Sequence, residues 1–317
     1  MPLELPRAPR LVLDARLRPV AGSSFQPTGF ANLGPAEFTR PGGQPSLLVE
    51  SVQSMANHLE AVGTDAASRE PIELLRPLPW IAVRDPEGRL LTSSRLEPHR
   101  LASAYLRNAT IDDENGATWL ADRLGLAPKT PLDMPAIYRA VFELDPLCLI
   151  HGVFFSAREF PGNPKIRRVT AATIEAHGVA PLVSGGLKRD DVQFVTSEGS
   201  GAEEGYGFVP FSRTEYVADE IVLSAVVDLE QVRGYGLAAE QTRLLELLAL
   251  WELTSLLDGP LRLRTACDLE IESVEVRKPE GLALPPAGEV VAELASAIDA
   301  VTFEAPGERT AVWSPKG

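Results

Sequence analysis

The order of two kinds of hydrophobic periodicity constrains the fold of this chain more than any other feature. Residues 9–20 alternate apolar and polar side chains, which predicts a strand with one wet, arginine-lined face. Residues 51–62 repeat apolar side chains at i, i+3, i+4 and i+7, which predicts a helix with a buried stripe. The later segments predict a strand at 220–228, a helix at 237–257 ended by Gly259-Pro260, a strand at 261–276 and a helix at 288–300. Strands that alternate with helices, with long excursions between them, indicate an α+β or α/β sandwich with insertions.

Four further stretches complete this pattern. Residues 147–156, with the sequence LCLIHGVFFS, predict a buried strand, and residues 169–177 predict a short helix. Residues 64–145 predict an irregular, largely helical insertion that is broken by prolines. Residues 178–214 are rich in glycine, including Gly185-Gly186, and predict a projecting hairpin or a mobile loop.

The net charge of −14 is concentrated in the C-terminal part of the 317-residue chain. Residues 190–317 hold 9 Lys+Arg against 24 Asp+Glu, whereas residues 1–189 hold 21 against 20. Within the near-neutral part, residues 158–189 carry six basic side chains against two acidic ones, and residues 7–18 carry four arginines against one aspartate. Local potential, not total charge, governs contact with phosphate, so an acidic chain can still present a basic groove to nucleic acid. The same charges also fit ordinary solvated faces.

Cysteine usage and hydropathy indicate a protein of the reducing cytosol. The two cysteines, Cys148 and Cys267, lie in apolar, strand-like runs and are expected to be small buried hydrophobes. The first residues lack the basic flank and apolar stretch of a signal peptide. No segment comes near the roughly 18 uninterrupted apolar residues of a membrane span. We therefore expect a cytoplasmic protein with no membrane partner.

The sequence contains no recognisable signature of catalysis or of metal binding. The glycines at 199–207 lack both a Gly-Lys-Ser/Thr sequence and the spacing of a dinucleotide-binding loop. The four histidines occur singly, and a histidine such as His151 in an apolar segment is typical of a core residue. The run Asp112-Asp113-Glu114 is typical of a solvated acidic loop, and no serine stands in a nucleophile elbow. We expect no enzyme activity, no metal and no cofactor.

Three segments of the sequence favour phosphate binding more than any segment favours catalysis. The loop 26–30, the helix start at 51–57 and the basic run 158–168 combine small hydrogen-bond donors, amides, arginines and aromatic residues. A helix N-terminus offers free N–H groups and a partial positive charge to a phosphate. Serine and glutamine there add neutral donors that contact a backbone without reading its sequence. The alternative interpretation is that Ser51 is simply the helix N-cap, with Ser54 and Asn57 as surface polar residues.

Segment 48–60, LVESVQSMANHLE, resembles the ESVQSxANRLE signature of a known family. That family is the crRNA-binding backbone subunit of type I-G (formerly I-U) CRISPR effector complexes, in the Cas-seven branch of the RAMP superfamily. Further similar segments stand in the same order at 25–30, 93–100, 152–155, 167–168 and 262–269. The resemblance therefore covers nearly the whole chain and rests on several motifs in order, none of which is decisive alone.

The helix start also looks like the Ser-Ser-Gln-Ser segment of other type I backbone subunits, whose small donors contact guide-RNA phosphates. In those subunits basic residues usually follow, whereas this chain has Asn57 and His58 at the matching places. This departure shifts the expected phosphate contact toward Arg158–Arg168.

The resemblance implies an α+β fold with an RRM-like (ferredoxin-like) palm, a large helical finger insertion and a thumb hairpin or loop. It implies a single domain over 1–317, with the palm at 9–20, 51–62, 147–177 and 220–276, the fingers at 64–145 and the thumb at 178–214. Copies would stack as a filament along one CRISPR RNA, together with other effector-complex subunits, and the thumb would kink the RNA. The splayed guide bases would then pair with target DNA, so that the acidic C-terminal part faces other subunits or solvent.

The residues predicted to bind RNA come from these motifs and from the basic runs. They are Gln26, Thr28, Phe30, Ser51, Gln53, Ser54, Asn57, Arg95, His99, Arg100, Arg158, Lys165, Arg167, Arg168, Lys188 and Arg189. Phe30 is the first candidate for stacking on a base.

Two other functions remain open from the sequence. The first is a RAMP-type endoribonuclease that processes guide RNA, for which His58 or His99 would supply acid–base chemistry. Related backbone subunits of another CRISPR type cut target RNA with an acidic loop residue, a role for which Asp112 or Asp113 are candidates. The second is a small-molecule enzyme with the glycine-rich loop as a lid.

Overall fold

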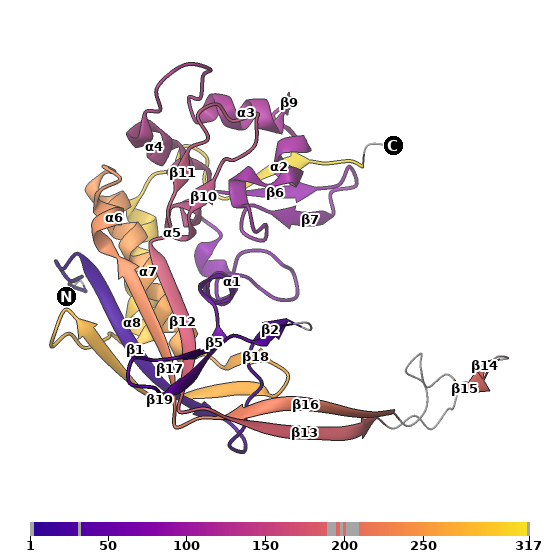
Figure 1. Cartoon of the computed structure of the whole chain (residues 1–317). Helices are drawn as coiled ribbons and strands as arrows, with labels where there is room; N and C mark the ends of the chain where they lie inside the picture. Colours follow the sequence, from indigo (N-terminus) through magenta and orange to yellow (C-terminus); the bar gives the residue numbers. More distant parts are fainter. Residues whose placement is uncertain (1–2, 31–32, 189–194, 197–198, 201–208, 316–317) are drawn as a thin grey trace.

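The computed structural model describes residues 3–30, 33–188, 195–196, 199–200 and 209–315 (Figure 1). It is a mixed α+β protein with several sheets, as the alternating periodicities predict. In the described residues no helix is long and apolar enough to cross a membrane.

A seven-stranded sheet forms the framework of the molecule. Its strand order is β18 (Leu261–Arg264), β19 (Cys267–Lys278), β1 (Arg10–Pro19), β17 (Glu220–Asp228), β12 (Thr170–His177), β5 (Pro45–Glu50) and β4 (Glu37–Thr39). Successive neighbours are antiparallel. Alternate residues of the central strands are buried, including Leu13, Ala15 and Leu223 at 0% exposure, so one face of the sheet is apolar and the other is wet.

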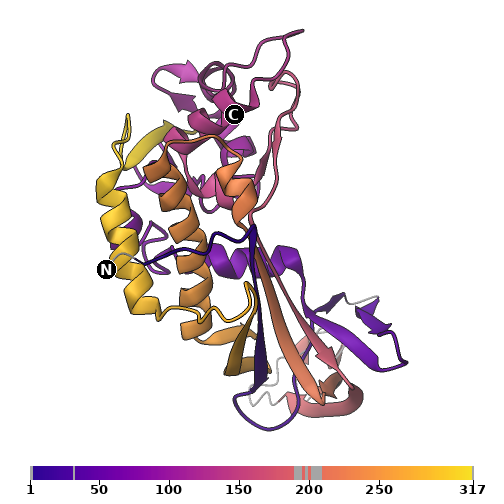
Figure 2. The ribbon, with the colours of Figure 1, turned by 90° about the vertical axis from the view of Figure 1, so that its left-hand side faces the viewer.

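Helices cover the apolar face of this sheet. The long helix α7 (Ala239–Asp258) contacts α1 (Val52–Ala61), α5 (Leu147–His151), α6 (Leu229–Arg233) and α8 (Ala287–Ala300). Figure 2, in which α7 is orange and α8 is yellow, shows these two helices side by side against the sheet. Because α7 is apolar on most of its sides, it can be buried between the sheet and α8, and each fully buried leucine contributes about 1.5–3 kcal/mol.

A second, smaller sheet organises residues 64–145 together with the end of the chain. Its order is β7 (Leu90–Ser93), β6 (Trp80–Arg84), β20 (Glu308–Val312), β8 (Thr110–Ile111) and β9 (Glu114–Asn115). The helical elements around it are η1 (Glu73–Leu75), η2 (Arg100–Ala102), α2 (Ala104–Asn108), α3 (Gly116–Arg123) and α4 (Met134–Leu144). Helices supply most of the regular structure of residues 64–145, as expected, but the small sheet was not predicted. The apolar run that forms β6 is short enough to fit a strand or a helix, and its partner β20 lies more than two hundred residues away in sequence.

Two hairpins and several short ladders complete the structure. The hairpin expected at 178–214 is formed by β13 (Ala180–Lys188) paired with β16 (Val209–Val217), so it runs three residues past 214, and it extends away from the main body in Figure 1. Near the centre, β10 (Val153–Phe154) pairs with β11 (Lys165–Ile166). The remaining short strands are β2 (Gly29–Phe30), β3 (Gly34–Pro35), β14 (Val195–Thr196) and β15 (Gly199–Ser200).

Three sequence-based expectations about local structure were wrong. Residues 147–151 form helix α5, not a strand, because the segment begins at Pro146 and ends where Gly152 adopts φ 77°. Cys148 is therefore buried on a helix, although it is a small core residue as expected. Residues 170–177 form strand β12, not a helix, because their apolar side chains alternate, a period-two pattern hidden by the alanines. The expected strand at 261–276 is two strands, β18 and β19, joined at a turn where Ala266 has φ 58°.

Candidate nucleic-acid interface

The N-terminus of helix α1 presents small polar groups to solvent. Ser51 is the N-cap, and its hydroxyl accepts a hydrogen bond from the Ser54 N–H at 3.2 Å. Gln53 and Asn57 are exposed, Ser54 is half-buried, and the first turn contains no acidic side chain. The cap interpretation of Ser51 is thus confirmed. The cap leaves other first-turn N–H groups for an anion, because only one orphan donor is satisfied by it.

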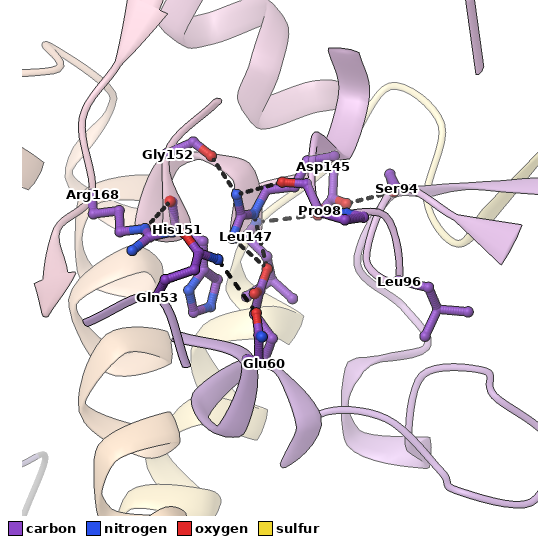
Figure 3. Close-up of polar contacts among 12 residues, drawn as sticks. Gln53, Glu60, Ser94, Leu96, Pro98, Asp145, Leu147, His151, Gly152 and Arg168 are labelled. Atoms are coloured by element: carbon purple, nitrogen blue, oxygen red, sulfur yellow. Dashed lines mark hydrogen bonds and ion pairs between the residues drawn. The ribbon is translucent and has the colours of Figure 1, made fainter. Parts of the chain in front are cut away.

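Arg168 joins this helix start to the beginning of strand β12. Its guanidinium donates to Gln53 Oε1 at 2.5 Å, to the Val52 carbonyl at 3.5 Å and to the His151 carbonyl at 3.3 Å. Figure 3 shows Gln53 and Arg168 directed toward each other at the edge of α1. Partial burial, with a smaller effect of the nearby Arg100, lowers the pKa of Arg168, but an arginine stays charged in proteins. A fixed positive charge therefore stands beside the free end of α1.

Gly152 sets the position of the basic segment that contains Arg168. It has φ 77°, and a Cβ there would lie 2.7 Å from the Ile166 carbonyl oxygen and 3.0 Å from the Arg168 nitrogen. Only glycine therefore allows the chain after α5 to pack directly against residues 166–168. Lys165 and Arg167, on the same segment, are exposed.

The loop 26–28 lies at the same end of α1. Its Thr28 N–H donates to the Val49 carbonyl at 3.3 Å, next to the start of the helix. Arg264 holds the two parts together, because it donates to the Gln26 carbonyl at 3.0 Å and to the Val49 carbonyl at 3.2 Å, and it pairs with the buried carboxylate of Glu50. Arg264 was not among the predicted site residues. Its motif at 262–269 was recognised, but nothing in the sequence shows that it reaches across to 26 and 49.

Arg95 and Arg100 occupy a different environment from the one predicted for phosphate contacts. Their side chains are only 5% and 7% exposed. Arg100 pairs with Glu60 at 2.8 Å and donates to the Gly152 carbonyl at 3.1 Å. Arg95 lies 3.6 Å from the buried Asp145. These arginines form an internal cluster with Glu60 and Asp145, the two carboxylates labelled in Figure 3, and are not surface contacts. Charges buried this deeply are retained when they are paired.

The remaining predicted residues fall into two groups. His99 is exposed, and Arg158 is exposed with its guanidinium 3.5 Å from Glu159. Gln26 and Thr28 are half-buried in their loop. The side chains of Phe30 and Lys188, and the whole of Arg189, lie outside the described residues. The structure thus brings together Gln26, Thr28, Ser51, Gln53, Ser54, Asn57 and Arg168 around the first turns of α1. Lys165 and Arg167 lie on the segment that leads to Arg168, and no contact joins their side chains to α1 among the described residues.

The arginines of strand β1 do not add a free basic stripe. Arg10, Arg16 and Arg18 are exposed on the wet face of the sheet, as the alternation predicts. Each lies within 4 Å of a carboxylate: Arg10 of Asp228, Arg16 of Glu220 and Arg18 of Glu270. Their charge is largely balanced locally.

The residues weighed for catalysis do not form a constellation. His58 lies 4.0 Å from Glu50, and burial lowers its pKa. Asp112 accepts hydrogen bonds from the Trp119 indole and from Arg309. Among the residues that the structure describes, no three His, Cys, Asp or Glu side chains gather as a candidate metal site.

The fold and this surface define a mixed α+β protein with a polar, partly basic interface at a helix N-terminus. The family model for CRISPR-associated protein GSU0053 matches residues 11–181, more than half of the chain. The chain belongs to this CRISPR-associated family. The match confirms the resemblance at that level, while the type I-G subtype stays a prediction.

Two solved structures resemble the chain in part. One, "CRISPR RNA-guided surveillance complex, pre-nicking", has 13% sequence identity, a TM-score of 0.43 and a match that covers 86% of this chain and 78% of that one. The other, the crystal structure of Thermofilum pendens Csc2, has 13% identity, a TM-score of 0.31 and coverage of 95% and 79%. No curated protein matches the chain.

Proposed function

We propose that this chain is the crRNA-binding backbone subunit of a type I CRISPR effector complex, of the type I-G kind that its motifs resemble. The observation that carries the proposal is the junction of the α1 N-terminus with Arg168. Free helix N–H groups, the Ser54 and Gln53 side chains and one fixed guanidinium converge there. Together they fit a phosphodiester backbone, because all of them favour an anion and none reads a base.

Binding of this kind is tolerant of sequence and sensitive to salt. Each phosphate that is neutralised on a single strand contributes a slope of about −0.7 to log K against log salt concentration. Sequence recognition then belongs to base pairing between the guide and target DNA. The subunit acts as a scaffold that presents the guide, and we propose no catalytic residue and no cofactor for it.

Assembly along the RNA would use the projecting hairpin β13–β16. In this proposal the RRM-like palm is the seven-stranded sheet with its helices, the fingers are 64–145 and the thumb is 178–214. The hairpin carries Leu182 and Val183 at 43% and 77% exposure, and such apolar side chains are suited to contact a neighbouring copy. Other effector-complex subunits would cap the filament in the cytoplasm.

The test is a salt-titrated binding assay of purified protein with its own repeat-spacer RNA and with a scrambled single strand. Mass photometry on the same samples reports assembly, and gel analysis reports whether the RNA is intact. Tight, salt-dependent binding to both strands, growing oligomers and intact RNA are expected. Absence of binding at low salt, or cleavage at one position, would direct attention to the endoribonuclease alternative and to His58 and His99.

A further inference from the structure

The aromatic side chain of Phe154 is exposed in a place where its neighbours are buried. Phe154 lies in the two-residue strand β10, and the residue is 46% exposed. The flanking Val153 and Phe155 are 4% and 0% exposed, because successive side chains of a strand point to opposite faces. Val153 and Phe155 thus pack into the core, whereas Phe154 faces solvent.

One cation lies over this ring. In the β10–β11 ladder Phe154 stands opposite Lys165, and the Lys165 ammonium lies 5.4 Å from the centre of the ring. A cation over an aromatic face is a favourable arrangement, and a lysine beside a stacking ring supplies the positive charge that an adjoining phosphate needs.

Phe154 is also tied to the interface around α1. Arg168, which contacts Gln53 of α1, donates to the carbonyl of His151, three residues before Phe154. Three residues of extended chain span at most about 11 Å. The close packing of Gly152 on residues 166–168 fixes this short connection. A strand that contacts the α1 N-terminus can therefore reach the ring within a few nucleotides.

We infer that Phe154 is a base-stacking residue, which holds an unpaired nucleobase of a single-stranded nucleic acid while Lys165 contacts the adjoining phosphate. This inference rests on the proposed function and adds a base contact to its backbone contacts. An isolated ring bordered by a lysine suits a nucleotide better than an apolar protein partner, which would need a larger continuous apolar patch.

The experiment measures the affinity of Phe154→Ala, Phe154→Leu and Phe154→Trp proteins for a single-stranded RNA and for an abasic ribose-phosphate strand of equal length. On RNA, Phe154→Ala is expected to bind about 5- to 150-fold more weakly than the original protein, with an unchanged salt slope. Phe154→Leu keeps most of the apolar volume and is expected to lose affinity as well, whereas Phe154→Trp keeps or exceeds the original affinity. On the abasic strand all four proteins are expected to bind equally.

The controls separate this inference from the proposed function. If the unsubstituted protein does not bind RNA, the proposed function fails and the inference fails with it. If it binds and Phe154→Ala and Phe154→Leu bind equally well, only the inference is overturned. It is also overturned if the loss persists on the abasic strand, or if the variants lose self-association in mass photometry while single copies keep their RNA affinity, because Phe154 would then contact protein.

Discussion

The Arg100 guanidinium lies 2.8 Å from a carboxylate oxygen of Glu60, so the last turn of α1 is ion-paired to η2, the turn between strands β7 and β8 of the small sheet. The two residues are 7% and 18% exposed, and Arg100 also donates to the Gly152 carbonyl. The helix that carries the candidate phosphate contacts is thereby joined, through one arginine, to the glycine that positions Arg168. The position of the interface therefore depends on a largely buried ion pair.

Removing either Glu60 or Arg100 should lower the free energy of unfolding. Glu60→Ala leaves the Arg100 charge buried and unpaired, and we expect a loss of about 3–5 kcal/mol in the free energy of unfolding, measured by urea denaturation. The double variant Glu60→Ala/Arg100→Ala should lose less than the sum of the two single changes. The exposed pair Arg18–Glu270 serves as the matched control, since Arg18→Ala there should cost less than about 1 kcal/mol. Equal losses at the two sites would contradict this account.

Arg167→Ala combined with Arg168→Ala should weaken RNA binding and flatten its salt dependence. Each phosphate contact that is lost reduces the slope of log K against log salt by about 0.7. The measurement is a fluorescence anisotropy titration at several salt concentrations, with thermal unfolding to check that stability changes little. Arg139→Ala, an exposed arginine on α4, is the control for loss of charge alone. An unchanged slope in the double variant would move the binding surface elsewhere.

Gly152→Ala should both destabilise the protein and weaken RNA binding. The substitution meets a positive φ and a carbonyl oxygen 2.7 Å from the new Cβ, so residues 166–168 must shift. Gly88 has φ 85° and open space around it, so Gly88→Ala isolates the conformational cost, about 1–3 kcal/mol. Urea denaturation should show a larger loss for Gly152→Ala than for Gly88→Ala, and only the former should reduce RNA affinity. Similar behaviour of the two variants would count against a positioning role of Gly152.

Stability should fall with rising pH through the buried pair His151–Glu252. Their side chains are 2.8 Å apart. Burial disfavours the charged imidazole, but the attraction of Glu252 and Glu60 outweighs it and raises the pKa of His151 above its ordinary 6.5. For His151 the folded chain therefore holds the proton more tightly than the unfolded chain, and this contribution is complete below about pH 6.5 and is lost as pH rises through the folded pKa.

Glu252→Gln removes the attraction that keeps the imidazole charged, so the variant should lose this part of the pH dependence. Urea denaturation between pH 5.5 and 9 compares the two proteins. The difference in stability should be greatest at the acidic end and shrink toward the alkaline end. Parallel curves would show that the pair does not titrate in this range.

The hairpin β13–β16 should matter for assembly and not for folding. Leu182→Ser combined with Val183→Ser replaces two exposed apolar side chains, and such surface changes usually alter stability by less than about 0.5 kcal/mol. Mass photometry with RNA should show fewer copies per strand, while the affinity of a single copy stays unchanged. Oligomers of normal size would exclude these two side chains from the contact between copies.

Regular segments with strong periodicity could be predicted from the sequence, and mixed segments could not. The expected strand at 9–20, the helix at 51–62 and the long helix after 237 are β1, α1 and α7. The alanines in β12 masked its period of two, and the short apolar run of β6 had no local sign of its distant partner β20.

The candidate site could be predicted in its local parts only. The Ser51 cap follows from sequence spacing, whereas the contact between Gln53 and Arg168 joins residues far apart in the chain. Arg95 and Arg100 resemble surface arginines in the sequence, because burial depends on partners such as Asp145 and Glu60 that the fold brings to them.

Strand β20 lies between β6 and β8 and is parallel to β6, with Glu308 paired to Trp80. During synthesis, more than two hundred residues are therefore added after β6 before β20, the central strand of the small sheet, is made. Until then β6 offers an unpaired edge, and unpaired edges are sites of aggregation in slowly completed sheets. If the ribosome released the chain before residue 308, α1 and the seven-stranded sheet would have all of their residues. The small sheet would lack β20, and the edge of β6 would stay unpaired. The formation of that sheet can thus report whether synthesis has passed this point.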